Sequence, residues 1–406
     1  MHKPNRIKKL RLNSRKIFWL RALMNVKMIN AVMSLFYLHR GLELSDIFYI
    51  SLLWSIANLL FEVPSSYLAD RWGRKPTIIT GVVFGGLYWV SYIFADSFGI
   101  FALGAVFYGI STALLSGTDE ALVYDSHKEA GEESSSLKKL GNYHAAQKVF
   151  KIFAPIIGVL LAHDLAEGQF VLILCIDILA TLLALGIALT LVEANHKMDV
   201  KKSEAGVMKD AWKLLSQNPD LRRGMFGKIL PFIATLVTWH YYQAFFTDLG
   251  VPLLLVGIGW GSASFIIFFS HLYIEKITRG RNLRILIDMC NFVTLLFLSV
   301  FLCFWFGLPQ PYILYGLYLA FIIVENIRMP LYSEFFNKHS HSYNRATTLS
   351  LSNFLKSAVD VPLMLLTGMV IGLNIIYPYF IALTLCIVTI VFFRLGKVKL
   401  ETNTSA

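Results

Sequence analysis

The sequence predicts an all-α membrane protein with twelve transmembrane helices arranged as two six-helix bundles. Hydrophobic residues make up 56% of the 406 residues and charged residues only 16%, whereas about a quarter of the residues in soluble proteins are charged. Apolar stretches long enough to cross a bilayer recur along the whole chain. The longest polar stretch divides these segments into two groups of six.

Twelve segments have this apolar character, although several contain polar residues. They span residues 17–39, 47–68, 77–95, 99–124, 142–163, 169–192, 225–247, 254–275, 284–306, 311–333, 345–372 and 376–395. Because twelve is an even number, both termini are expected on the same side of the membrane.

The basic residues indicate which side this is. Of the 37 lysines and arginines, 30 fall in the termini and loops of one side, and only Arg40 falls in a loop of the other. Loops rich in lysine and arginine stay in the cytoplasm. The termini are therefore predicted to be cytoplasmic. The net charge of +11 then reflects orientation, which argues against a nucleic-acid partner.

The domain organisation follows from the same segments. In the linker, Met208, Trp212 and Leu215 share one helical face, which predicts an amphipathic helix on the membrane surface. The predicted parts are a basic cytoplasmic tail at 1–16, a first bundle at 17–192, the cytoplasmic linker at 193–224, a second bundle at 225–395 and a tail at 396–406.

The two halves also match each other at an offset of 207 residues. Identical or similar residues then coincide in corresponding segments and loops: Gly73 with Gly280, Arg74 with Arg281, Gly109 with Gly316, Lys138 with Arg345, and Pro155 with Pro362. Five pairs in register indicate a duplicated six-helix unit. Many secondary transporters have this architecture, with a binding site near the membrane midplane.

The loop "LADRWGRK" (Leu68 to Lys75) joins the second and third segments on the predicted cytoplasmic side. It closely resembles the signature loop of the major facilitator superfamily, G-x-L-A-D-R-x-G-R-K, with Ser66 in place of the leading glycine. "APIIGV" (Ala154 to Val159) is similar to the antiporter motif of the drug/proton antiporter branch, with two glycines replaced. "SGTDEALVYD" resembles uncharacterised bacterial members. The resemblance implies a bacterial inner-membrane transporter with alternating access.

The charges of the loop have several possible partners. Gly73 allows a tight turn. Asp70 can pair with Arg74, cap a neighbouring helix N-terminus, or do both, and Asp125 is a second possible partner for Arg74. The resemblance implies a conformational latch for the outward-open state, formed by Asp70, Arg71, Gly73, Arg74, Lys75 and Asp125. The alternative is a solvated turn that only fixes topology.

Charged residues inside the apolar segments need a partner or water, because each costs about 2.5–3.5 kcal/mol at midspan. Arg21 lies near the start of its segment and is expected to reach the cytoplasmic interface. Lys148 is expected opposite Asp119 or Glu120, at the same depth of about 9 Å. The remaining basic residues with a candidate partner on their own helix are Arg328, with Glu325, and Lys356, with Asp360.

Lys27 and Lys151 have no partner on their own helices, and Lys27 shares a face with Asn30. Together with Lys148 they are candidates for the wall of a cavity that binds an anionic or zwitterionic substrate. The alternative is that the lysines pair with acids and stiffen the bundle. Proton coupling needs a carboxyl group whose pKa is tuned by burial and by nearby cations. The candidates are Asp119, Glu120, Glu325 and Asp360.

The seventh segment contains "WHYYQAFF". On a continuous helix its side chains at i, i+3, i+4 and i+7 share one face. They are candidates for substrate contact: Trp239, Tyr242, Gln243 and Phe246. The alternative interpretation is an aromatic packing stripe. The neighbouring His240 either titrates near neutral pH or is simply hydrogen-bonded.

No nucleotide-binding loop, metal-ligand spacing or nucleophile motif is present in the sequence, so an enzyme is not expected. A cofactor-free secondary transporter is predicted, driven by an ion gradient, with protons as the expected ion, and monomeric. The predicted task is export of a small organic solute, such as a polycarboxylate metal chelator or a drug-like compound. The alternatives are uptake of an organic anion or nutrient and, from another class, a non-transporting membrane sensor.

Overall fold

The structure, a computed structural model, describes residues 3–131, 150–194, 218–304, 307, 310–339 and 345–395. Within these ranges every regular element is a helix, which confirms the predicted all-α membrane fold. Seven helical stretches in the described residues are long and apolar enough to cross a membrane. Helices also occupy the described parts of the other five predicted segments. The total of twelve spans and the side of the termini stay predictions.

The chain forms two compact units. Unit 1 comprises residues 1–200 and 252–262, and unit 2 comprises residues 201–251 and 263–406. The predicted amphipathic linker helix and the C-terminal tail at 396–406 lie outside the described residues.

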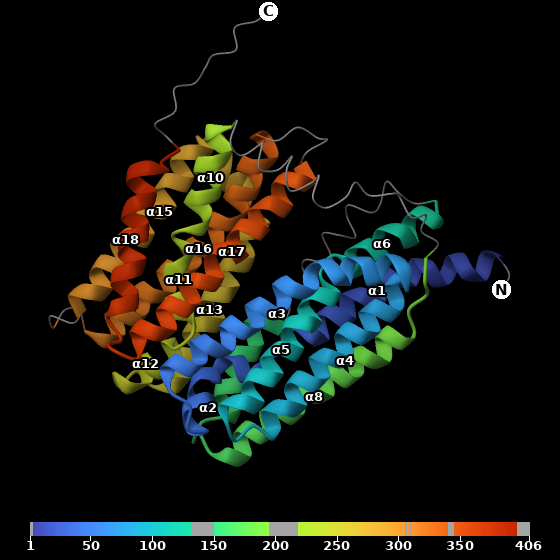
Figure 1. Ribbon diagram of the computed structural model, residues 1–406, viewed down its shortest axis with the longest axis horizontal. Coiled ribbons are helices and arrows are strands. Elements are labelled where there is room, and N and C mark those ends of the chain that lie inside the picture. The colour runs from blue at the N-terminus through green and yellow to red at the C-terminus, as the bar shows by residue number, and fades with distance from the viewer. Residues whose placement is uncertain are drawn as a thin grey trace, which may run out of the picture. The chain divides into compact units, whose positions relative to one another are not determined.

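Unit 1 contains a series of helices that begins with the broken first segment. Their bounds are α1 (Lys3–Met24), the 3₁₀ turn η1 (Met28–Ala31), α2 (Met33–His39), α3 (Leu44–Arg71), α4 (Arg74–Ile93), α5 (Phe98–Leu115), α6 (Thr118–Glu129), an unlabelled helix at Phe150–Leu161, and α8 (Glu167–Leu189). In Figure 1, α3, α5, α4 and α8 run side by side, each packed against the next.

The residues predicted as a basic tail form the start of α1. The helix begins at Lys3, and its side chains Leu10 and Asn13 are completely buried. Asn13 donates to the Ser126 hydroxyl over 2.8 Å and to the Val192 carbonyl over 2.7 Å. The segment is therefore a packed helix, because its apolar and amide side chains find partners on α6 and at the end of α8.

Two of the predicted segments in unit 1 are broken helices. The first breaks after Met24, where Lys27 takes a left-handed conformation with φ of 36°. The fourth breaks between α5 and α6, where Gly117 has φ of 70°. Breaks in apolar surroundings free backbone N–H and C=O groups that need new partners. These breaks determine where charged side chains are required.

In unit 2 the first segment is again divided into three helical pieces. Its helices are α10 (Pro219–Ile229), α11 (Phe232–Trp239), α12 (Tyr242–Asp248), α13 (Leu253–Leu272, whose start belongs to unit 1), α14 (Ile274–Thr278), α15 (Leu283–Phe304), α16 (Pro311–His339), α17 (Arg345–Ile371) and α18 (Tyr377–Phe392). Pro231 separates α10 from α11, because proline lacks the N–H that would continue the helix.

Aromatic side chains fill much of both cores. In unit 1 the rings of Phe36, Tyr92 and Phe101 pack together. In unit 2 Phe301 stacks on Tyr379 with ring centroids 4.1 Å apart, and Phe297 stacks on Phe321 at 4.2 Å. Such pairs add specific geometry to the burial of apolar area.

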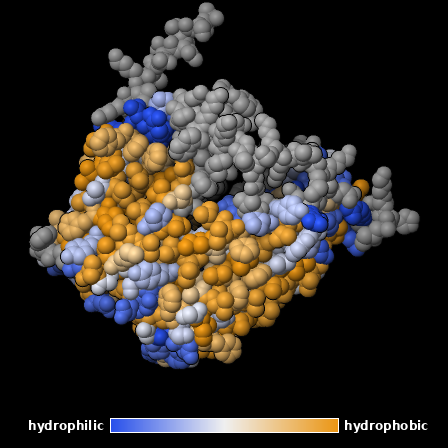
Figure 2. Space-filling model, in the orientation of Figure 1, coloured by the Kyte–Doolittle hydropathy of each residue, from blue (hydrophilic) through white to orange (hydrophobic). Residues whose placement is uncertain are grey.

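The outer surface of unit 1 is apolar between two polar ends. Five leucines of α8 are 49% to 58% exposed: Leu172, Leu179, Leu182, Leu183 and Leu189. In Figure 2 hydrophobic residues cover the middle of the visible face of this unit, and hydrophilic residues gather at its ends. Exposed apolar surface of this extent is that of a protein surrounded by lipid.

Candidate functional site

The signature loop of unit 1 forms an ordered charge network. Gly73 has φ of 105° and precedes α4, a conformation that glycine adopts without strain. Arg74 lies 2.6 Å from the carboxylate of Asp125 on α6, one of the two partners considered from the sequence. Arg71 donates to the Tyr67 hydroxyl over 2.9 Å. Asp70 lies near the end of α3, with its side chain outside the described set.

The carboxylate that caps α4 comes from Glu193, which the sequence analysis did not single out. Its two oxygens accept from the backbone N–H groups of Arg74 and Lys75 over 2.8 and 2.7 Å. A carboxylate at a helix N-terminus satisfies free donors and interacts favourably with the helix dipole. Glu193 therefore caps α4, and the capping role considered for Asp70 stays a prediction. The sequence offered one indication of the cap by Glu193, because Glu193 is an acidic residue directly after the sixth apolar segment.

Lys27 lies at the break of the first segment. Its ammonium donates to the hydroxyl of Tyr108 on α5 and lies 4.8 Å from that ring's centroid. Its left-handed backbone is rare for a residue other than glycine, and such conformations gather at functional sites. In the part of the chain that the structure describes, Lys27 forms no ion pair within 4 Å.

The break itself is stabilised by Asp177 on α8, a second residue that the sequence analysis did not assign to the site. Its two carboxylate oxygens accept from the N–H groups of Met28 and Ile29 over 2.8 and 3.2 Å. Asp177 is 1% exposed, so its negative charge is used on free backbone donors. In the sequence, an acidic residue inside an apolar segment without a basic partner on the same helix was the indication that a neighbouring helix is broken.

Lys151 belongs to the same region of unit 1. It is exposed on the helix Phe150–Leu161 and lies within electrostatic range of the Lys27 ammonium and the Tyr108 phenol. Within the described residues, no carboxylate lies within ion-pair distance of Lys151. Asn30 is exposed, but the helix break removes the continuous face that it was expected to share with Lys27. Lys148 lies outside the described residues.

Aromatic rings surround the Tyr108 phenol. Trp54 stacks on it with centroids 6.0 Å apart and 23° between the planes, and Tyr88 stacks at 4.7 Å and 26°. We call Lys27, Lys151, Tyr108, Trp54 and Tyr88 the Lys27 site. It combines two cations with a flat aromatic surface. This combination suits an organic anion.

Arg21 is used inside the bundle, and the prediction that it reaches the cytoplasmic interface is wrong. Its guanidinium pairs with Asp119, which is completely buried, and donates to the Leu115 carbonyl over 2.9 Å. Leu115 is the last residue of α5, so its carbonyl lacks a partner in its own helix. The need to satisfy this carbonyl and neutralise Asp119 keeps Arg21 inside. The expected partner of Asp119, Lys148, is not described.

Unit 2 contains a similar network around Arg328, which is completely buried. Arg328 donates to Glu325 over 2.6 Å and to the carbonyls of Gly227 and Lys228 over 3.1 and 3.3 Å. The Gly227 carbonyl is the one that residue 231 would bond in a continuous helix, and residue 231 is a proline. Arg328 therefore replaces the missing N–H. The predicted pair Glu325–Arg328 is present.

Glu325 has further donors. The Thr294 hydroxyl donates to it over 2.6 Å, and the Thr235 hydroxyl over 3.3 Å. Arg328 also donates to Asn291 over 3.1 Å. The hydrogen-bonding capacity of the buried Glu325 carboxylate is therefore used by a guanidinium and two hydroxyl groups.

The other predicted pair, Lys356 and Asp360 on α17, is also present. It is less enclosed, because the Lys356 side chain is 33% exposed. The Lys356 ammonium lies 4.2 Å from the ring centroid of Phe232. Glu120, the last of the acidic candidates, lies in the first turn of α6 and is half-buried.

The aromatic stripe of the seventh segment is divided. The chain breaks at His240 and Tyr241, so Trp239 ends α11 and is 40% exposed, whereas Tyr242 starts α12. The continuous helical face expected from the sequence is interrupted at this break, although the rings of Trp239 and Tyr242 still lie 6.0 Å apart. Gln243 and Phe246 are buried at 3% and 1% exposure. Tyr242 and Phe246 pack on Tyr318, at centroid distances of 5.2 and 5.4 Å.

His240 lies at the same break. Its Nδ1 is 2.6 Å from the carbonyl of Leu236 one turn earlier. Of the two interpretations considered for this histidine, the hydrogen-bonded one matches the geometry.

Comparison with known proteins identifies the family. The family model of the major facilitator superfamily matches residues 21–361. The chain belongs to the major facilitator superfamily. One similar protein is the uncharacterised MFS-type transporter YxaM of Bacillus subtilis (strain 168), 24% identical over 327 residues, which cover 78% of this chain and 77% of that protein. Another is the inner membrane transport protein YajR of Escherichia coli (strain K12), 27% identical over 201 residues, which cover 49% and 42%.

Solved structures share the fold of this superfamily member. A mutant of the nucleoside transporter NupG superposes with a TM-score of 0.77 at 13% identity, over 95% of this chain and 98% of that one. The D-xylose-proton symporter superposes with a TM-score of 0.69, also at 13% identity, over 95% and 96%. The predicted family and fold are therefore confirmed. The protein is a multi-pass membrane transporter of a small molecule, not an enzyme, and its bacterial relatives agree with the predicted inner membrane.

Proposed function

We propose that this superfamily member exports a small anionic or zwitterionic organic solute in exchange for protons, and that the Lys27 site binds the anionic group. The observation that carries the proposal is the position of Lys27. Asp177 is already used by two backbone donors at the same break, and the Lys27 ammonium lies beside the Tyr108 ring. A cation held without a carboxylate in an aromatic setting is suited to a ligand.

Lys151 strengthens this proposal. Two like charges within interaction range repel each other, and an anion placed between them removes the repulsion. The stacked rings of Trp54 and Tyr108 supply a flat apolar surface for the carbon skeleton. The indole Nε1 of Trp54 is buried and donates no hydrogen bond within the described residues.

For the proton, we propose Asp360. Asp119 and Glu325 each pair with an arginine that also holds a free backbone carbonyl. Arginine stays charged in proteins, so protonation of either acid would leave a buried unpaired guanidinium. Asp360 has a half-exposed lysine as its partner. A lysine can turn to water when the carboxyl group takes up a proton.

The test compares the compounds that cells accumulate with and without the protein. Export predicts lower intracellular and higher external levels of at least one organic anion when the protein is present, with a protonophore abolishing the difference. Accumulation that rises with the protein and collapses with protonophore would instead show uptake.

Asp360→Asn tests the coupling step on the substrate found in this way. We expect the variant to lose proton-driven accumulation in membrane vesicles but to keep substrate counterflow, because counterflow needs no net proton movement. Lys356→Gln serves as the matched control, since it removes the partner and leaves the carboxyl group in place. Wild-type proton-driven transport by Asp360→Asn would rule out Asp360 as the proton carrier.

A further inference from the structure

A groove lies between α1 and α8 on unit 1, outside the Lys27 site. It has a volume of about 350 Å³, at the lower end of the range for ligand sites. We call it the α1–α8 groove. It is lined by Leu12, Arg15, Lys16, Trp19, Leu183, Gly186, Ile187 and Thr190. Thr190 follows the last turn of α8, so the groove lies where an apolar helix reaches the membrane surface.

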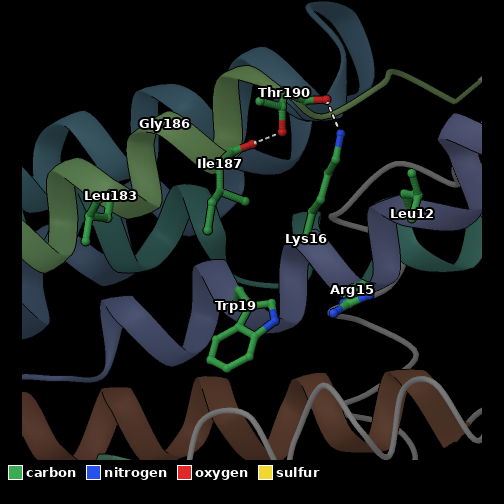
Figure 3. Close-up of a pocket in the computed structure, with 8 residues that line it drawn as sticks. All are labelled: Leu12, Arg15, Lys16, Trp19, Leu183, Gly186, Ile187 and Thr190. Carbon is green, nitrogen blue, oxygen red and sulfur yellow. Dashed lines mark hydrogen bonds between the residues drawn. The ribbon is translucent and has the colours of Figure 1, made fainter.

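One part of the groove is apolar and open. Trp19 is 46% exposed and Leu183 is 54% exposed. Figure 3 shows the side chains of Leu183 and Ile187 extending from α8 toward α1, and both line the groove together with Trp19. At Gly186, an added Cβ would meet no atom within 4 Å, so the floor of the groove has free space. Tryptophan is enriched at the membrane–water interface, where one side of its ring is apolar and the other is wet.

The other part is basic. The Lys16 ammonium donates to the Thr190 carbonyl over 2.6 Å, which satisfies a free acceptor at the end of α8 (Figure 3). Burial, together with the neighbouring charges of Lys75 and Lys9, lowers the pKa of Lys16. Arg15 is exposed and forms no hydrogen bond or ion pair within the ranges that the structure describes. The basic end therefore holds positive charge that lacks a counter-charge.

We propose that the α1–α8 groove binds one anionic glycerophospholipid, with its head group on Arg15 and Lys16 and one acyl chain along Trp19, Gly186 and Leu183. Basic pockets between transmembrane helices bind the head groups of anionic lipids. The charge of the groove matches such a head group. Its exposed apolar walls match an acyl chain, because they continue the lipid-facing leucines of α8.

A soluble anion fits the groove less well than a lipid. Phosphate or a soluble organic anion would use only the two cations and would leave the exposed indole and leucine side chains in water. A phospholipid covers both parts at once, since it carries a phosphate and hydrocarbon on the same molecule. The predicted orientation places this site in the cytoplasmic leaflet, where anionic lipids attract basic residues.

The direct test is lipid titration of the purified full-length protein in detergent, with native mass spectrometry counting bound lipids. Dioleoyl phosphatidylglycerol is expected to form a 1:1 complex, and dioleoyl phosphatidylcholine a much weaker one. Inorganic phosphate at the same concentration is expected not to displace the lipid. Displacement by phosphate, or equal binding of both lipids, would overturn the proposal.

Variants separate the two parts of the site. Each basic residue near an anionic surface contributes about fivefold in affinity, so Arg15→Gln with Lys16→Gln is expected to weaken phosphatidylglycerol binding about thirtyfold. Lys8→Gln with Arg11→Gln is the matched control, because it removes two charges from the same helix outside the groove lining. Equal losses in the two double variants would show unspecific attraction and contradict the site.

Gly186→Leu tests the acyl chain. The new side chain has room in the groove and improves helix propensity, so α8 is expected to remain folded. It should displace the lipid chain and weaken binding at least tenfold with an unchanged unfolding temperature. A phosphatidylglycerol with brominated chains should also quench Trp19 fluorescence, measured as the difference from Trp19→Phe. Unchanged binding by Gly186→Leu would contradict the assigned groove.

Discussion

Each unit stabilises a broken helix with an arginine, a buried carboxylate and a free backbone carbonyl. The arginine comes from a different span in each unit. In unit 1 Arg21 lies on the first span and donates to the Leu115 carbonyl at the break of the fourth. In unit 2 Arg328 lies on the tenth span and donates to the Gly227 carbonyl at the break of the seventh. The buried carboxylate comes from the fourth span as Asp119, and from the corresponding tenth span as Glu325.

The difference shows what the duplication has kept. At the offset of 207, Arg21 corresponds to Lys228 and Asp119 to Asn326, so neither the arginine nor the buried acid of unit 1 recurs at the same position in unit 2. What recurs is the physical arrangement, in which a guanidinium neutralises a buried acid and satisfies a carbonyl freed by a break. Unsatisfied backbone groups are costly in apolar surroundings. The arginine networks therefore stabilise breaks, which agrees with the proposal that the Lys27 site binds the substrate.

The largest expected effect follows from removing the arginine of unit 2. Arg328→Met leaves Glu325 as an unpaired buried charge and two carbonyls without donors. Breaking a buried ion pair in this way costs about 3–5 kcal/mol. We expect a large drop in the unfolding temperature measured in detergent. Adding Glu325→Gln should restore part of the loss, and no recovery in the double variant would contradict the pairing.

A smaller loss is expected for the arginine of unit 1. The Arg21 side chain is 16% exposed, so water reaches the site after Arg21→Met more readily than it reaches Glu325. Loss of hydrogen bonds to a charged group costs about 1.5–3 kcal/mol. The same unfolding assay checks the order, with Arg11→Met as a control on the exposed part of α1. A larger drop in unfolding temperature for Arg21→Met than for Arg328→Met would contradict the expected order of the two arginine networks.

The third-largest effect is expected for Asp177, which caps the break in the first segment. Asp177→Leu removes the acceptor of the Met28 and Ile29 N–H groups, and loss of a helix cap costs about 0.5–2 kcal/mol. Asp177→Asn keeps an acceptor oxygen and should lose less. Hydrogen exchange at residues 28 and 29 should rise in the leucine variant. Identical stability and exchange in wild type and Asp177→Leu would show that the cap is dispensable.

The smallest effect is expected at the membrane surface. Glu193→Gln keeps the hydrogen-bond acceptor for Arg74 and Lys75 but removes the charge. A charge at a helix N-terminus contributes about 0.3–1 kcal/mol and is screened by salt. The stability difference from wild type should therefore shrink when the ionic strength rises. A difference that does not depend on salt would mean that Glu193 acts through packing.

The apolar segments and the signature loop were sufficient to predict the all-helical fold and the family. The pairs Glu325–Arg328 and Lys356–Asp360 were also predictable, because partners three or four residues apart on a helix are adjacent. The turns at Gly73 and Gly280 match across the repeat, since both have positive φ. Gly109 and Gly316 do not match: an added Cβ would lie 2.7 Å from the Trp54 carbonyl at Gly109 but in open space at Gly316.

The helix breaks could not be predicted from hydropathy. Segment 17–39 is apolar enough on average to be assigned as one span, and only the contacts of Asp177 and the backbone of Lys27 reveal where it unwinds. Arg21 stays inside the bundle because its guanidinium bonds the Leu115 carbonyl at the break after α5. Glu193 caps α4 because the segment after α8 packs against the start of α4. Such long-range partners are set by packing, which periodicity along one helix does not report.

The central claim is that Lys27 and Lys151 bind the transported anion and that the arginine networks stabilise the fold. The most direct test measures proton-driven transport of the identified substrate by Lys27→Gln with Lys151→Gln in proteoliposomes, with the unfolding temperature of the same preparation. Removing two charge-assisted contacts should lower transport at subsaturating substrate at least tenfold, with the unfolding temperature retained. Wild-type transport by the double variant would contradict the account.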